Sequence, residues 1–488
     1  MANFDLTNLA VKMICPNNVV KTDDTDLPSV LVYIPKFKNS DVLAGGNDST
    51  HPAFIVNGVE IPGFYYGKYQ AKVYNSVAYS LPGEDPTASI NFDTARARCE
   101  AKGAGWHLST NAEWAAIALW CKKNGFLPYG NNNYGKDSRE SNYKAVPSYY
   151  ESGKIARVAT GTGPISWSHD KTMAGIWDLN GNVWEWQGGI RLVWGELQIL
   201  ANNDAADPDN PQNATSTCWK AINAADGALV DPESKTTDSS AHVSGKTVKL
   251  DYVNNKWTYS TSITNAKDES RSCAFYQVAA DSSIGDAAKV MLRALALLPD
   301  SDVTTDVYEG DYMWWNNGVA ERCVYRGGNW NNGANAGVFY LNGNNSRSNA
   351  NTNIGFRAAL ALFVYFLRAK AQQKHRGKRD AFPGRQGQRY TLVLLCRWRP
   401  PETPSKPRRL AVVCYAGRRG IRILRRGDRR GKISPRNVTT RAIIMTTQGG
   451  TRTWIQETSP PFWREYTRGR IFWTHTTRQQ ARSGTATM

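Results

Sequence analysis

The string Gly175-Ile-Trp-Asp-Leu-Asn-Gly-Asn-Val-Trp-Glu-Trp186 constrains the fold more than any other part of the sequence. Its centre is rich in Asp, Asn and Gly, which predicts a tight polar turn. The tryptophans on both sides are large rigid rings, so we expect them to pin this turn into a core. A calcium-binding EF-hand loop is excluded. Val183 occupies the sixth position, where that loop needs Gly, and Gly189 occupies the twelfth, where it needs Glu.

The distribution of charge divides the chain near residue 362. The net charge of +18 comes from residues 363–488, which hold 29 Lys and Arg against 5 Asp and Glu, whereas residues 1–362 hold 31 against 37. The basic part sets short apolar bursts among Arg pairs and prolines without a sustained period, so we expect an unstructured tail. An Arg-rich arm that binds nucleic acid is the alternative. The longest apolar run, residues 358–367, is too short to cross a bilayer, and the N-terminus lacks a signal-peptide pattern.

The acidic part of the chain indicates an α+β domain with long loops. Asn57-Gly58 predicts a hairpin over residues 54–61, because both residues tolerate positive φ. Asn91 caps a helix predicted over 91–103, and the capping box Thr110-Asn-Ala-Glu113 starts a second helix. The remaining expectations are strands within residues 1–53, a helix over 285–298 that Pro299 stops, and surface loops over 129–145, 201–217 and 231–245.

Further strings flank the tryptophan-rich one, and their order is informative. They are Lys68-Tyr69, His107-Leu-Ser-Thr-Asn-Ala-Glu-Trp114, Tyr325-Arg-Gly-Gly-Asn-Trp330 and Ile354-Gly-Phe-Arg357. Glycine pairs beside Trp are typical of closely approaching backbones, and Arg beside Phe is typical of a guanidinium held on aromatic or carboxylate partners. The strings resemble, in order, those of the formylglycine-generating-enzyme (sulfatase-modifying factor) family, a variant of the C-type lectin fold with "GNVWEW", "RGGSW" and "GFR" strings.

This resemblance implies a C-type-lectin-like domain over about residues 54–362, with residues 190–310 as an insertion. Residues 1–53 would be strands that lead into the domain, and 363–488 the tail. The framework residues implied are Trp177, Trp184, Glu185, Trp186, Gly327, Gly328, Trp330, Phe356 and Arg357.

The resemblance implies the fold and not the chemistry. In the enzymes of this family, copper-binding cysteines lie between the "RGG" and "GFR" strings, whereas residues 329–353 contain no Cys and Cys323 precedes the "RGG" string. Thiolates are the soft ligands that hold Cu(I), and amides cannot replace them. The related iron enzymes need a clustered histidine triad, and the six His are dispersed. We therefore expect no enzyme activity, no cofactor and no metal; a divergent oxidoreductase is the alternative.

An Asn-rich segment replaces the enzyme site. Residues 329–353 hold ten Asn in twenty-five residues, with Val338, Phe339 and Leu341 in the middle expected to pack inward. The segment resembles the variable region of target proteins of diversity-generating retroelements, which share the lectin fold. There, an error-prone reverse transcriptase changes template adenines, and Asn codons yield many residues without a stop. The variable, ligand-binding positions implied are Asn329, Asn331, Asn332, Asn335, Tyr340, Asn342, Asn344, Asn345, Asn349, Asn351 and Asn353.

The function favoured by the sequence is therefore a non-enzymatic ligand- or receptor-binding protein, with a hypervariable surface on a rigid scaffold. Asn lacks the anchoring strength of Trp, Tyr or Arg, so we expect this copy to bind weakly. The expected partner is a protein or carbohydrate on a cell surface, with nucleic acid only through the tail; an oligomer is compatible with the sequence. The expected location is a phage virion, such as its tail, or a bacterial surface.

Overall fold

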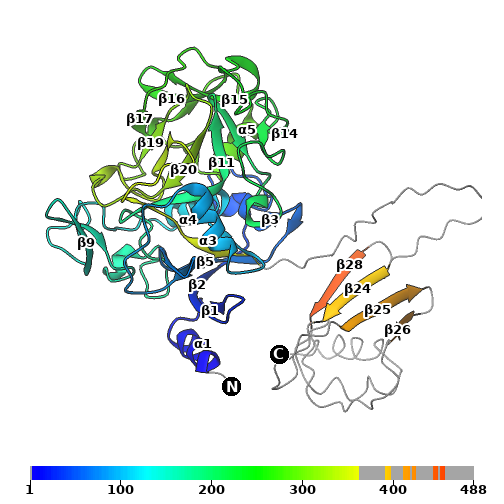
Figure 1. The fold of residues 1–488 in the computed structure, drawn as a ribbon. Coiled ribbons are helices and arrows are strands. Elements are labelled where there is room, and N and C mark those ends of the chain that lie inside the picture. Colours follow the sequence, from blue (N-terminus) through cyan, green and yellow to red (C-terminus); the bar gives the residue numbers. More distant parts are fainter. Residues whose placement is uncertain are drawn as a thin grey trace, which may run out of the picture. The chain divides into compact units, whose positions relative to one another are not determined.

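The computed structural model describes residues 3–361 and, beyond them, residues 391–396, 410–417, 420–424, 443–448 and 451–456. The chain divides into two units, Met1–Val364 and Tyr365–Met488, close to the break in charge (Figure 1). In the second unit an antiparallel sheet contains β24 (Thr391–Cys396), β25 (Leu410–Gly417) and β26 (Gly420–Leu424), and a hairpin contains β27 (Ile443–Gln448) and β28 (Thr451–Gln456). We expected an unstructured tail and did not expect these strands. The other residues of 363–488 lie outside the described part of the chain.

A five-stranded sheet joins the two ends of the first unit. Its order is β1 (Asn18–Thr22), β2 (Pro28–Pro35), β5 (Gly63–Gly67), β23 (Ala358–Leu360) and β8 (Trp106–Leu108). β23 pairs antiparallel with β5 on one side and with β8 on the other. The segment before residue 54 was expected to hold only strands, but it also forms the helices α1 (Asn3–Ile14) and α2 (Asn39–Val42).

A twelve-stranded sheet forms the larger part of this unit. Its main path runs through β17 (Arg271–Ala274), β19 (Tyr312–Trp315), β21 (Leu341–Asn345), β20 (Arg322–Arg326), β11 (Trp184–Val193), β12 (Glu196–Ile199), β15 (Ser244–Val253), β16 (Lys256–Ser262) and β18 (Ala279–Ala280). Off this path, β13 (Lys220–Ile222) pairs with β12 and with β14 (Leu229–Val230), and β22 (Ile354–Gly355) pairs with β11. Residues 190–310 therefore extend the same sheet that carries the framework strings.

The local signals in the sequence formed the expected elements. Asn57 and Gly58, both at positive φ, connect β3 (Ile55–Val56) to β4 (Val59–Glu60). Asn91 caps α3 (Phe92–Glu100), and Thr110 caps α4 (Asn111–Lys123) in a two-way capping box with Glu113. The helix expected over 285–298 is shorter, because α5 (Asp286–Ala294) ends before Ala296, which has a φ of 50°.

Hairpins and single turns complete the unit. The hairpins are β6 (Ala71–Tyr74) with β7 (Val77–Ser80) and β9 (Pro147–Glu151) with β10 (Lys154–Val158). The 3₁₀ turns are η1 (Pro52–Phe54), η2 (Ile165–Trp167), η3 (Asp204–Ala206), η4 (Phe275–Gln277) and η5 (Gly333–Asn335). The loop 129–145 was expected at the surface, but Asn131, Asn132 and Asp137 are buried because their side chains bind the turn at Asn180–Asn182 and the loop's own backbone.

The core lies on both sides of the large sheet. Trp315, Val324 and Leu341 are buried in one apolar cluster together with residues of α4 and α5, whereas Trp186 and Tyr325 belong to a second cluster with Phe92 and Cys99 of α3. The described residues are thus mostly β with few helices, and the sheet is curled (Figure 1), which is consistent with a C-type-lectin-like fold. Among these residues, no helix has both the length and the apolar character needed to cross a membrane.

Candidate functional site

The framework strings meet around one buried ion pair. Arg357 Nε and Nη2 donate to the two carboxylate oxygens of Glu185 at 2.8 and 2.6 Å, and both side chains are at most 1% exposed. The same guanidinium donates to the carbonyl oxygens of Gly67 and Trp177, each at 2.9 Å. The guanidinium is thus held on a carboxylate, one of the two kinds of partner expected from the sequence. Because β22 pairs in parallel with β11 at Trp184 and Glu185, the "GFR" string lies directly beside the tryptophan-rich string.

Aromatic rings in tilted and edge-to-face contact hold the other side of this framework. The ring of Trp184 lies 4.5 Å from that of Tyr340 and 4.8 Å from that of Tyr325, and Trp186 lies 4.9 Å from Tyr325. Trp186 Nε1 also donates to the carbonyl of Ile90 at 2.9 Å. Such contacts supply both apolar burial and ring–ring attraction. Trp177, Trp330 and Phe356 are likewise buried.

Gly327 and Gly328 form the turn that leads into the Asn-rich segment. Both have positive φ, at 89° and 84°. A Cβ atom at Gly327 would lie 2.8 Å from the carbonyl oxygen of Leu179, and one at Gly328 would lie 2.5 Å from the Cβ of Ala336. Backbone conformation and close approach therefore both require glycine at this pair.

The middle of the Asn-rich segment forms β21, an interior strand of the large sheet. β21 lies between β19, to which it is parallel, and β20, to which it is antiparallel. Val338, Phe339 and Leu341 are buried, as expected for the apolar middle of the segment. A rigid interior strand therefore carries the centre of the segment, and loops lie on both sides of it.

The predicted variable positions differ in exposure. Asn331 and Asn351 are exposed, whereas half-burial is found for Asn332, Asn335, Asn342, Asn344, Asn345, Asn349 and Asn353. Asn329 and Tyr340 are 1% and 3% exposed, so their assignment to a ligand-binding surface needs correction. The Asn329 side chain bonds within its own backbone turn, where its Oδ1 accepts from the backbone amide of Asn331 at 3.1 Å. The ring of Tyr340 is covered by that of Trp184.

A second distinction separates Asn side chains that shape the backbone from those that do not. Asn332 Oδ1 accepts from the amide of Asn329 at 2.8 Å, and Asn342 Oδ1 accepts from the amide of Asn344 at 3.0 Å. The side-chain Nδ2 of Asn344 donates to Ser270 Oγ, and the side-chain Nδ2 of Asn345 donates to the Tyr325 hydroxyl. Within the described part of the chain, no side-chain hydrogen bond is made by Asn331, Asn335, Asn349, Asn351 or Asn353. We call these five positions the exchangeable set.

Two aromatic side chains that the sequence reading missed border the segment. Tyr312 and Trp314 of β19 are half-buried, and Trp314 is in register with Asn342 of β21. Their signal was present in the string Tyr312-Met-Trp-Trp315, where alternate residues face opposite sides of a strand. A small cavity of about 50 Å³ lies near η5 and is lined in part by Arg139, Asp311 and Gly337. That volume holds water rather than an organic ligand.

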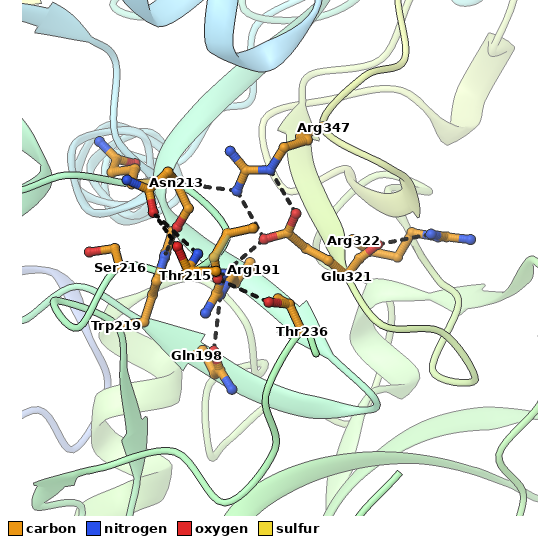
Figure 2. A network of polar contacts seen from close by, with 12 residues as sticks. Arg191, Gln198, Asn213, Thr215, Ser216, Trp219, Thr236, Glu321, Arg322 and Arg347 are labelled. Carbon is orange, nitrogen blue, oxygen red and sulfur yellow. Dashed lines mark hydrogen bonds and ion pairs between the residues drawn. The ribbon is translucent and has the colours of Figure 1, made fainter. Parts of the chain in front are cut away.

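Arg347 is the other residue that the sequence reading missed. It lies in the Asn-rich string, and its guanidinium donates to Glu321 (Figure 2). It also donates to Asp93 and to the carbonyl of Gln212. It is the only charged residue between 329 and 353, which was the available signal. An isolated charge in a polar string indicates a specific partner elsewhere in the fold.

Groups that could support metal or redox chemistry have structural partners in the described residues. No cluster of three or more His, Cys, Asp or Glu side chains in that part of the chain is arranged to hold a metal ion. Burial raises the pKa of the Cys323 thiol to about 12, which disfavours the thiolate that a soft metal needs. His107 Nε2 lies 2.8 Å from Glu113, and His51 Nε2 lies 2.8 Å from the carbonyl of Ala294.

Comparison with known proteins gives similar solved structures only. No protein-family model and no curated protein matches the sequence. The Major Tropism Determinant U1 variant is 12% identical, over 68% of this chain and 62% of its own length, with a TM-score of 0.24. Treponema denticola variable protein 1 is 12% identical, over 70% and 98%, with a TM-score of 0.25. The Major Tropism Determinant P3c variant is 11% identical, over 70% and 71%, with a TM-score of 0.24. This chain thus spans less than two thirds of the length of the U1 variant. At these TM-scores the three structures are similar to this chain, and no further conclusion follows from them.

Proposed function

We propose that residues 54–362 form a non-enzymatic ligand-binding domain that displays a variable surface on a lectin-type scaffold of the formylglycine-generating-enzyme kind. In this proposal residues 190–310 are an insertion and 329–353 the variable region. The ligand is a protein or carbohydrate on a cell surface, and the chain acts on a phage virion or a bacterial surface. A chain with these properties would be the target protein of a diversity-generating retroelement.

The observation that carries the proposal is the exchangeable set. Two of these five residues are exposed and three are half-buried, and none makes a side-chain hydrogen bond within the described residues. The frame that presents them is buried, with the Glu185–Arg357 pair on one side and the contacting rings of Trp184 and Tyr340 on the other. Substitutions at such surface positions usually change stability by less than about 0.5 kcal/mol. The arrangement therefore separates folding from recognition.

The remaining Asn positions extend this surface without being equally exchangeable. Asn342, Asn344 and Asn345 are half-buried on β21 and its end, beside Trp314, and each takes part in a hydrogen bond. A half-buried Trp supplies the rigid contact area that amides lack. In this proposal the constant aromatic side chains of β19 provide affinity, and the exchangeable set provides specificity.

Sequencing of the natural locus tests the proposal. We expect a reverse-transcriptase gene near an adenine-rich repeat of codons 329–357, and sister genomes that differ at the exchangeable set. Codons for the framework residues Trp184, Glu185 and Arg357 provide the internal control and should be constant. A locus without the repeat, or substitutions spread evenly over framework and Asn codons, would contradict the proposal.

A further inference from the structure

Arg347 connects the Asn-rich segment to three separate parts of the scaffold. Its Nε and Nη2 donate to the two carboxylate oxygens of Glu321 at 2.7 and 2.9 Å. Its Nη1 donates to Asp93 of α3 at 2.7 Å, and Nη2 also donates to the carbonyl of Gln212 at 3.1 Å. Figure 2 shows the guanidinium directed toward Glu321. The Arg347 side chain is 17% exposed and Glu321 is 11% exposed, so their pair is largely shielded from water, whereas Asp93 is 53% exposed.

The partner of Arg347 is itself fixed. Glu321 is 11% exposed and accepts a second guanidinium, that of Arg191, at 2.8 Å (Figure 2). Arg191 lies over the ring of Trp219 at 4.3 Å and donates to Gln198 at 3.0 Å. Burial alone would raise the pKa of Glu321, but the hydrogen bond and charge of Arg347, together with Arg191, lower it. Glu321 therefore stays ionised at neutral pH, and a bidentate pair of this kind fixes geometry as well as charge.

Besides Arg347, residues 346–353 are anchored by one side chain, Thr352, whose Oγ1 donates to Glu151 at 2.9 Å, and by backbone carbonyls. The carbonyl of Arg347 accepts from the amide of Phe92 at 3.1 Å, and that of Asn351 accepts from the amide of Ser89 at 3.0 Å. The carbonyl of Thr352 accepts from Arg157 at 2.9 Å, and that of Asn353 from the amide of Trp184 at 2.9 Å. These bonds do not depend on the side chain at the accepting residue. Of the three Asn in this stretch, none uses its side chain for a hydrogen bond to the described residues.

We propose that Arg347 is a constant positioning residue of the variable surface. It holds the backbone of residues 346–353 in one shape, so that the side chains at 349, 351 and 353 can be exchanged while the loop keeps its form. The inference rests on the proposed function, since it assigns a fixed point within the surface that this function varies. A loop without this anchor would visit other shapes, and the fraction competent to bind would fall.

A selected binder provides the test. The full chain is displayed with the exchangeable set randomised and is selected against lysozyme as a probe protein. Arg347→Ala and Arg347→Lys are then introduced into a binder. The matched control is Arg96→Ala, because Arg96 is also 17% exposed but its ion pair, with Glu100 at 2.5 Å, lies within α3. Affinity is measured well below the melting temperature, together with amide hydrogen exchange.

The expected result is that Arg347→Ala weakens binding by about tenfold or more, as a fall of the competent fraction to about a tenth requires. Exchange protection should fall at Phe92 and across residues 346–353. The melting temperature should change by only a few degrees, about 2–4 °C per kcal/mol, because Glu321 keeps Arg191. Arg347→Lys should bind with intermediate affinity, since an ammonium keeps the charge but not the two-pronged bond. Arg96→Ala should leave affinity within about twofold.

Binding of the Arg347→Ala binder within about twofold of its parent would overturn the inference. A library that yields no binder would instead count against the proposed function. In that case hydrogen exchange on the original chain still tests the positioning role. Unchanged protection of residues 346–353 in Arg347→Ala would overturn the inference there too. If Arg347→Ala does not fold, Arg347→Lys carries the same comparison.

Discussion

Breaking the Glu185–Arg357 pair should destabilise the domain strongly. Arg357→Met removes both bonds to Glu185 and the donors for the carbonyls of Gly67 and Trp177. It leaves a fully buried carboxylate whose remaining side-chain donor is Gln70 Nε2 at 3.1 Å. Loss of one partner of a buried pair costs about 3–5 kcal/mol, because the other charge remains without compensation. Glu185→Met should cost a similar amount, since it leaves the buried guanidinium without a carboxylate.

The double variant Glu185→Met with Arg357→Met separates this charge effect from packing. It removes both charges together, so the two carbonyls become the main loss, worth about 1–3 kcal/mol. The double variant should therefore cost much less than the sum of the single variants. The measurement is guanidinium-chloride unfolding of the four proteins, followed by tryptophan fluorescence. Single-variant losses below about 1 kcal/mol, or losses that simply add in the double variant, would refute the reasoning.

Four further predictions follow from the same structure. Burial raises the pKa of Asp178 from 3.8 to about 6, so between these pH values the folded state holds a proton that the unfolded chain has released. The free energy of unfolding of the parent should therefore fall as the pH rises from 3.8 to about 6. Asp178→Asn should lack that fall when unfolding is measured at pH values across the same range. Trp186→Ala should cost about 3–5 kcal/mol in the same assay, and a loss under about 1 kcal/mol would show that the ring is not core. Asn332→Ala should cost about 1 kcal/mol through its lost bond to the Asn329 amide, whereas Asn349→Ala should stay within about 0.5 kcal/mol, because its buried Nδ2 has no acceptor in the described residues. A chain ended at residue 362 retains β23, so it should show a cooperative melt like that of the full chain, and loss of that melt would make the tail integral.

Sequence reasoning succeeded where the signal was local. The Asn57-Gly58 hairpin and the capping box of Thr110 and Glu113 depend on residues within a few positions of one another, and both formed as expected. The Glu185–Arg357 pair was also partly predictable from the sequence, because a buried Arg beside Phe needs a carboxylate partner and the framework strings contain few carboxylates.

It failed where the deciding contact is distant. The helix over 285–298 ends early because residues 294–298 turn to bury their side chains against the core, which no local pattern shows. The parallel pairing of β19 with β21 and the merging of residues 190–310 into one sheet are long-range choices of the same kind. Ten identical Asn residues also gave no means of separating Asn332, which shapes a turn, from Asn351, which does not.

The position of β23 has a consequence for the variation that we propose for residues 329–353. This strand follows the Asn-rich segment in the chain, yet it fills the gap between β5 and β8, which are made much earlier. A copy whose reading frame is lost within residues 329–353 therefore leaves two strand edges open in its first sheet and lacks Arg357 opposite Glu185. Exposed edges mark a chain for aggregation or degradation. Under the proposed function the fold itself therefore tests each varied copy, since a chain completes its first sheet only when residues 329–353 have been translated in frame.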